Sequence, residues 1–91
     1  MRVYHGTTKD QVVRISRLGL LPGSWVSQDR AVAEHFAVSR SEHVSQPAVV
    51  LVFVVTKRIL TRERRDRSGR VEQQTKTRLE IDWHLQAKET V

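Results

Sequence analysis

The stretch AVVLVFVV, residues 48–55, is the most apolar part of the chain and decides the fold. It is rich in the β-branched residues that favour strands. Its apolar character is continuous rather than alternating, which is typical of a strand buried on both faces. We therefore expect Ala48–Val55, opened by Pro47, to be the central strand of a sheet.

Two segments before this strand have the periodicity of amphipathic helices. The apolar residues of the first segment, Lys9–Leu18, fit one helical face, and Gly19 is placed to end the helix. Asp29 is a favourable N-cap for a second helix over Arg30–Ser39. Short strands are expected beside these helices, over Arg2–His5 and Ser24–Ser27.

The chain changes character after the central strand. Residues 57–70 hold seven basic side chains against two acidic ones, and therefore carry five of the six net positive charges. With few apolar residues and a turn at Ser68-Gly69, the basic segment up to Thr77 is expected to be a long loop or a mobile hairpin. Arg78–Gln86 alternates apolar and polar residues, which predicts a half-buried strand.

Composition narrows the class of protein. With 91 residues the chain is the size of one small domain, expected to span residues 1–91. It has no cysteine, which excludes disulfides and thiolate zinc sites, and its four histidines lack a metal-ligand spacing. There is no apolar run of the roughly 18–20 residues that span a bilayer, and no signal-peptide pattern. We expect a cytoplasmic protein without a metal or membrane partner, and the net charge of +6 favours an anionic one.

The run Tyr4-His5-Gly6-Thr7-Thr8, where the first expected strand ends, is the most informative motif. Together with the order of elements after it, this run resembles the ADP-ribosyltransferase fold. The match is best with the branch of diphtheria toxin and the poly-ADP-ribose polymerases, whose triad is His, Tyr and Glu. The resemblance implies an α+β domain with a small, split antiparallel β-sheet and two helices. It also implies a small toxin or effector that uses NAD as its cofactor to modify a macromolecule.

The resemblance assigns the NAD site to two regions of the chain. In the family, a strand-end His-Gly-Thr grips the adenosine ribose and the nicotinamide amide, which makes His5 a hydrogen-bonding post. Trp25-Val26-Ser27 stands where the branch has Tyr-Phe-Ala or Tyr-Phe-Ser, and Phe36 stands where it has a second stacking Tyr. Trp25 and Phe36 would form an aromatic clamp on the cationic nicotinamide ring. The NAD-binding residues so implied are His5, Gly6, Thr7, Trp25, Ser27 and Phe36.

The family also has a late acid, which holds the nicotinamide-side ribose and offsets the positive charge that develops as nicotinamide leaves. Asp82, followed by Trp83, resembles the Glu-Trp of many small members, and Glu80 is the alternative two residues earlier. The catalytic residues implied are His5, Trp25 and one of these two acids. Because Trp for Tyr removes a hydroxyl and Asp for Glu shortens the acid, a form that binds NAD without catalysis stays open.

Other functions remain as alternatives. The related RNA 2′-phosphotransferase branch also begins with His-Gly-Thr and uses NAD, but its later Arg and His-x-His elements are not evident here. The basic segment favours a non-catalytic nucleic-acid-binding or inhibitory module. In a transferase the same segment would guide an anionic protein or nucleic-acid acceptor. The residues assigned to either role are Arg62, Arg64, Arg65, Arg67 and Arg70.

Overall fold

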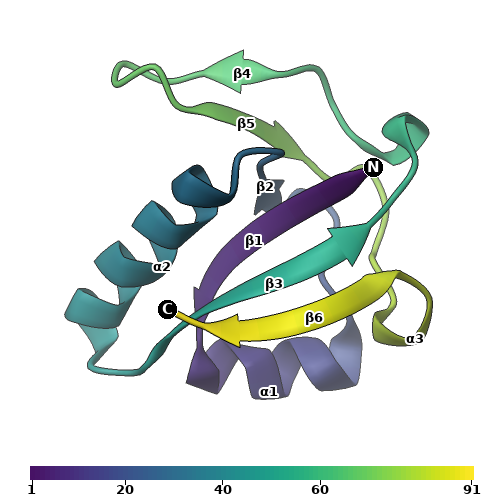
Figure 1. The fold of residues 1–91 in the computed structure, drawn as a ribbon. Coiled ribbons are helices and arrows are strands. Elements are labelled where there is room, and N and C mark those ends of the chain that lie inside the picture. Colours follow the sequence, from purple (N-terminus) through teal and green to yellow (C-terminus); the bar gives the residue numbers. More distant parts are fainter.

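In the computed structural model, the chain is a small α+β domain with two main helices and two small antiparallel sheets (Figure 1). The structure describes residues 1–91 except for the side chains of Asp82 and Trp83. This confirms the coarse expectation of an α+β domain with antiparallel sheets and two helices. In chain order the elements are β1 (Arg2–Thr8), α1 (Lys9–Leu18), β2 (Trp25–Val26), α2 (Arg30–Val44), β3 (Ala48–Val54), a 3₁₀ turn (Lys57–Ile59), β4 (Arg64–Arg65), β5 (Val71–Gln74), α3 (Ile81–His84) and β6 (Leu85–Thr90).

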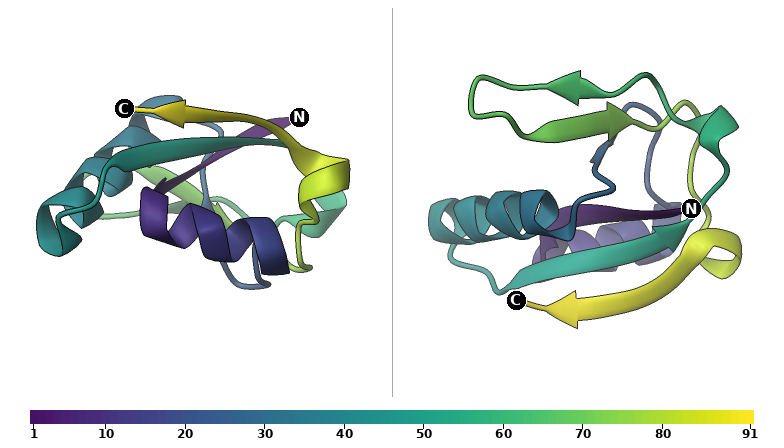
Figure 2. Two further views of the ribbon diagram at one scale, coloured as in Figure 1. Left: turned by 90° about the horizontal axis from the view of Figure 1, so that it is seen from below. Right: turned by 45° about the horizontal axis from the view of Figure 1, so that its top comes forward.

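The apolar strand β3 lies at the centre of the first sheet, as predicted. It pairs antiparallel with β1 on one side and with β6 on the other. Alternate residues of β3 enter two different cores, so that Leu51 packs with Ile15 of α1 while Val50 packs with Ala33 of α2. The continuous apolar run therefore reflects burial on both faces, and Figure 2 shows the two helices flanking this sheet.

The two main helices begin where the sequence predicts. Gly19 ends α1 at a positive φ of 76°, with its N–H donating to the carbonyl of Ile15 at 2.7 Å. The carboxylate of Asp29 caps α2 by accepting from the N–H of Ala31 at 3.0 Å. However, α2 continues to Val44, five residues beyond the predicted end. None of the described helices is both long and apolar enough to cross a membrane.

Gly6 allows α2 to lie directly on β1. A Cβ at this position would stand 1.9 Å from the carbonyl oxygen of Ala33 and 2.8 Å from the amide nitrogen of Ala37. Both obstructing atoms belong to the helix backbone, so no side-chain rotation would make room. The packing of α2 thus requires glycine here, whether or not a ligand also approaches.

The basic segment forms a hairpin within the second sheet, whose strand order is β2-β5-β4. Arg64 of β4 pairs with Glu72 of β5, and the turn between the strands has Gly69 at a positive φ of 79°. An isolated β-bridge joins this sheet to the first one, through reciprocal backbone hydrogen bonds of 2.7 and 2.9 Å between Tyr4 and Ser27. The right-hand view of Figure 2 shows the hairpin extending above α2 and β1.

The strand predicted over Arg78–Gln86 is wrong. Leu79 forms an isolated bridge with Leu20, after which the chain turns through α3 and only then enters β6. Both Leu79 and Ile81 reach the core, as their alternation predicted, but a helical turn lies between the bridge and the sheet edge. A short apolar alternation does not distinguish these two backbones.

Candidate functional site

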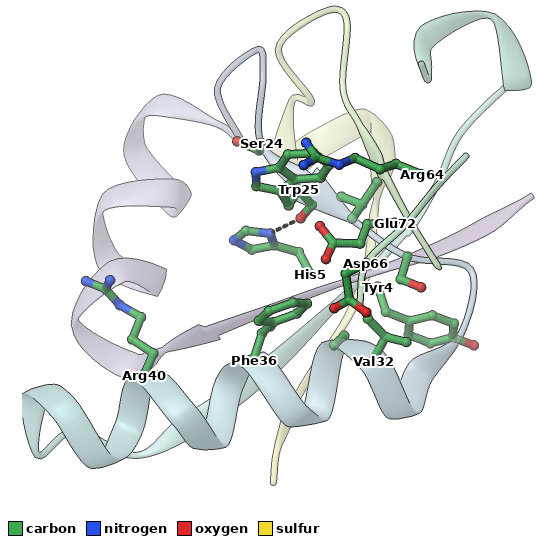
Figure 3. A pocket seen from close by; sticks show the side chains of 14 residues that line it. Tyr4, His5, Ser24, Trp25, Val32, Phe36, Arg40, Arg64, Asp66 and Glu72 are labelled. Carbon is green, nitrogen blue, oxygen red and sulfur yellow. Dashed lines mark hydrogen bonds between the residues drawn. The ribbon is translucent and has the colours of Figure 1, made fainter. Parts of the chain in front are cut away.

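A cavity of about 620 Å³ opens between β1, β2, α2 and the β4–β5 hairpin (Figure 3). Its size is that of a small-molecule site. The structure brings together in it most of the residues that the resemblance assigned to NAD, from three separate elements. The assigned residues that line it are His5, Gly6, Trp25, Ser27 and Phe36.

His5 lines the cavity and is held there by a hydrogen bond. Its Nδ1 lies 2.7 Å from the carbonyl oxygen of Trp25. A carbonyl can only accept, so Nδ1 carries the proton and Nε2 of the neutral ring is left as an acceptor. Burial lowers the pKa of His5 below its ordinary 6.5, the hydrogen bond to Trp25 raises it, and the charge of Arg40 lowers it further. The neutral ring can therefore accept a hydrogen bond through Nε2 from a hydroxyl or an amide N–H.

Trp25 and Phe36 lie on opposite sides of His5, as Figure 3 shows. Their exposed fractions, 37% and 38%, are high for aromatic side chains in a small domain, and both line the cavity. The guanidinium of Arg64 stacks on the Trp25 ring, with its carbon 5.4 Å from the ring centroid. One face of Trp25 is therefore covered by a side chain of the hairpin that also lines the cavity.

Two acids missed by the sequence analysis line the cavity, and both come from the hairpin: Asp66 and Glu72. The Asp66 carboxylate accepts from the amides of Ser68 and Arg70 at 2.8 and 2.9 Å, so it serves the turn. Those backbone bonds, led by that of Arg70, hold the pKa of Asp66 below its ordinary value. Glu72 has no hydrogen bond or ion pair with any side chain that the structure describes, and its carboxylate points into the cavity in Figure 3. Glu72 is thus the acid available to a ligand.

The acids predicted for this role lie in or beside α3. Glu80, at the start of α3, is exposed and pairs with Arg78 at 3.2 Å, outside the cavity that holds His5. Asp82 lies within α3, and its side chain is outside the described part of the structure. A signal for Glu72 was present in the sequence, because a hairpin about Ser68-Gly69 would place residues 71–74 in a strand with Glu72 and Gln73 on opposite faces.

Of the two hydroxyls assigned to NAD, one is used by the fold and the other lies outside this cavity. Ser27 donates to the carbonyl of Val71 at 2.6 Å and accepts from the amide of Asp29 at 3.1 Å. Thr7 is buried and lines a neighbouring cavity rather than this one. Ser27 consequently joins β2 to the hairpin, which is a structural role that the sequence analysis did not anticipate.

The basic hairpin is only partly available to a partner. Arg64 lies on Trp25, Arg65 donates to the carbonyl of Gly69 at 3.1 Å, and Arg70 lies 3.5 Å from the Asp66 carboxylate. Arg62 and Arg67 are exposed, and their guanidinium groups have no hydrogen bond or ion pair with the described residues. Arg64, Arg65 and Arg70 are therefore engaged within the domain, whereas Arg62 and Arg67 are accessible to a partner.

A second cavity, of about 290 Å³, adjoins the first on the α1 side. The two cavities share His5, Gly6, Ser24 and Arg40.

No group of three or more His, Asp or Glu side chains that could hold a metal ion is found among the described residues. Comparison of the chain with protein-family models, with curated proteins and with solved structures gives no match.

Proposed function

We propose that the larger cavity binds NAD and that the protein transfers ADP-ribose from NAD to a macromolecule. The observation that carries this proposal is the meeting of His5, Trp25, Phe36 and Glu72 in one cavity. His5, Trp25 and Phe36 are the His and the two aromatics that the resemblance to the ADP-ribosyltransferase fold calls for, although His5 lies within β1 rather than at its end. Glu72 supplies a carboxylate beside them. Glu72 takes the place that the sequence analysis gave to Asp82 or Glu80.

The chemistry needs a negative group near the reacting carbon. The bond between C1′ of the ribose and the nicotinamide nitrogen breaks, and its electron pair leaves with nicotinamide, which becomes neutral. Positive charge then develops on the ribose, where the carboxylate of Glu72 would stabilise it. The acceptor nucleophile forms the new bond to C1′ and loses its proton to solvent.

The other cavity residues would bind and orient NAD. Nε2 of His5 would accept a hydrogen bond from a ribose hydroxyl or from the nicotinamide amide. Trp25 and Phe36 would contact the cationic ring, for which Trp is the strongest aromatic partner. Because Arg64 covers one face of Trp25, the ring is expected to stack on the uncovered face.

The test is to incubate the protein with labelled NAD and a cell lysate, and to measure nicotinamide release alongside. Glu72→Gln is expected to lower transfer and nicotinamide release by about 100-fold or more, the usual effect of losing a charge-stabilising group. Glu80→Gln is the matched control, because it makes the same change outside the cavity. His5→Ala is expected to weaken NAD binding, which calorimetry measures.

The outcomes separate the function from the assignment of its acid. Full activity in Glu72→Gln together with loss in Asp82→Ala would return the acid to its predicted position. Absence of NAD binding, hydrolysis and transfer in the unmodified protein would rule out the proposed function.

The exposed arginines of the hairpin favour a second candidate, binding of nucleic acid through phosphates without NAD. Arg62 and Arg67 carry this candidate, because no described side chain pairs with their guanidinium groups. Affinity for an oligonucleotide should then fall steeply with salt and be lost in Arg62→Gln/Arg67→Gln. His5→Ala should leave this binding unchanged, and a salt-independent affinity would contradict the candidate.

A further inference from the structure

The cation Arg40 lies where the two cavities adjoin. It lies on α2, lines both cavities and is exposed to solvent. In Figure 3 its guanidinium lies on one side of His5 and Phe36, while Asp66 and Glu72 lie on the other side. Arg40 therefore lies across the site from Glu72 and from Asp66, which pairs with Arg70. Arg64, which also lines the larger cavity, lies over the Trp25 ring.

A buried hydroxyl holds the stem of Arg40 in place. Nε of Arg40 donates to Oγ1 of Thr8 at 3.3 Å. Thr8 is fully buried, and its hydroxyl donates in turn to the carboxylate of Asp10. Asp10 is the nearby acid. The hydrogen bond from Thr8 chiefly lowers the pKa of Asp10 and the charge of Arg40 adds to this, yet Asp10 and Arg40 do not form an ion pair. Since Nε is used, the two terminal nitrogens of the guanidinium remain to bind a ligand.

The smaller cavity adds a second cation on a wall of mixed polar and aliphatic side chains. Arg14 and Gln11 of α1 line it together with Leu18 and Leu20. Two guanidinium groups at one cavity match a diphosphate, because the planar fork of arginine donates to two phosphate oxygens at once.

We propose that Arg40, assisted by Arg14, forms a phosphate subsite that binds the diphosphate of a nucleotide lying across both cavities. The inference rests on the proposed function, because it takes NAD as that nucleotide. In this orientation the cationic nicotinamide points toward the carboxylate of Glu72 and the diphosphate toward the guanidinium of Arg40, while the Arg64 guanidinium lies over the Trp25 ring. The two cavities together have the size of a site for one such ligand.

The experiment compares the affinities of NAD, ADP and adenosine for the unmodified protein and for single variants by calorimetry. Arg40→Gln should weaken the binding of NAD and ADP about 10-fold or more, because the charge-assisted hydrogen bonds to the phosphates would be lost, and should leave the affinity for adenosine unchanged. Arg40→Lys keeps the charge but loses the planar fork of the guanidinium, so its affinities for NAD and ADP should lie between those of the unmodified protein and Arg40→Gln. Arg14→Gln should also weaken binding of NAD and ADP but not of adenosine. Arg17→Gln is its matched control and should change none of these affinities, because Arg17 is on the same helix but does not line this cavity.

Each outcome supports or overturns the subsite. If Arg40→Gln binds NAD and ADP as tightly as the unmodified protein, or loses adenosine equally, the subsite is wrong while NAD binding stands. If the unmodified protein binds ADP in an Arg40-dependent way but does not bind NAD, the subsite is supported and the proposed function fails. An oligonucleotide arm identifies the phosphate source, because loss of oligonucleotide binding in Arg40→Gln with NAD and ADP unaffected would overturn the nucleotide assignment.

Discussion

Replacement of Gly6 by alanine tests the close packing of α2 on β1. The new Cβ would begin 1.9 Å from the Ala33 carbonyl oxygen, whereas ordinary contacts start at 3.4 Å, so the helix must move by about 1.5 Å. Such a shift would loosen the contacts of Ala33 and Ala37 with β3. Overpacking costs about 1–3 kcal/mol, and backbone obstruction places this variant at about 3 kcal/mol. For a domain of this size that lowers Tm by about 12–24 °C.

The assay is thermal and urea unfolding followed by far-ultraviolet circular dichroism. Gly69→Ala is the control, because its Cβ would meet nothing within 4 Å and would suffer only from the positive φ of 79°. That strain costs about 1–2 kcal/mol. A loss in Gly6→Ala that is no larger than the loss in Gly69→Ala would refute the packing argument.

The remaining predictions concern three polar residues. Burial lowers the pKa of His5, so the unfolded chain binds more protons than the folded one below about pH 6.5. Urea unfolding should therefore show stability falling from pH 7 to pH 5, and less steeply in His5→Gln. Ser27→Ala leaves the carbonyl of Val71 unpaired and should cost about 1–3 kcal/mol, with an unchanged NAD affinity by calorimetry. Asp29→Ala removes the cap of α2 and should cost about 1 kcal/mol, measured by thermal unfolding, whereas Asp29→Asn should cost much less.

The parts of the fold that sequence predicts best are those with local causes. The run Ala48–Val54 is apolar on both faces because each face has its own helix, and this is visible in composition alone. Asp29 and Gly19 mark helix ends through bonds to backbone only a few residues away. Such contacts depend on short spacings that can be read along the chain.

Which acid lines the cavity depends on contacts between residues that are far apart in the sequence. Glu72 reaches the cavity because its hairpin pairs with β2, and the short strand around Glu72 has too few apolar residues to predict that pairing. The alternation of Leu79 and Ile81 favoured a strand, and a resemblance at Asp82-Trp83 drew the acid assignment there. The resemblance assigns Gly6 to ligand contact. That the packing of α2 on β1 requires a glycine there becomes apparent only when the helix is placed against the strand.

The β-bridge between Tyr4 and Ser27 has a consequence for how the molecule opens. Few backbone hydrogen bonds join the two sheets there. Val26 of β2 packs in the main core, but β4 and β5 place no residue in either core cluster of the described structure, so the hairpin can open locally without unfolding the β1-β3-β6 sheet. A ligand that contacts His5 on one sheet and Glu72 on the other would act as an additional tie across this junction. Occupancy should therefore slow amide hydrogen exchange most in β4 and β5, where the protein otherwise opens with the least free energy.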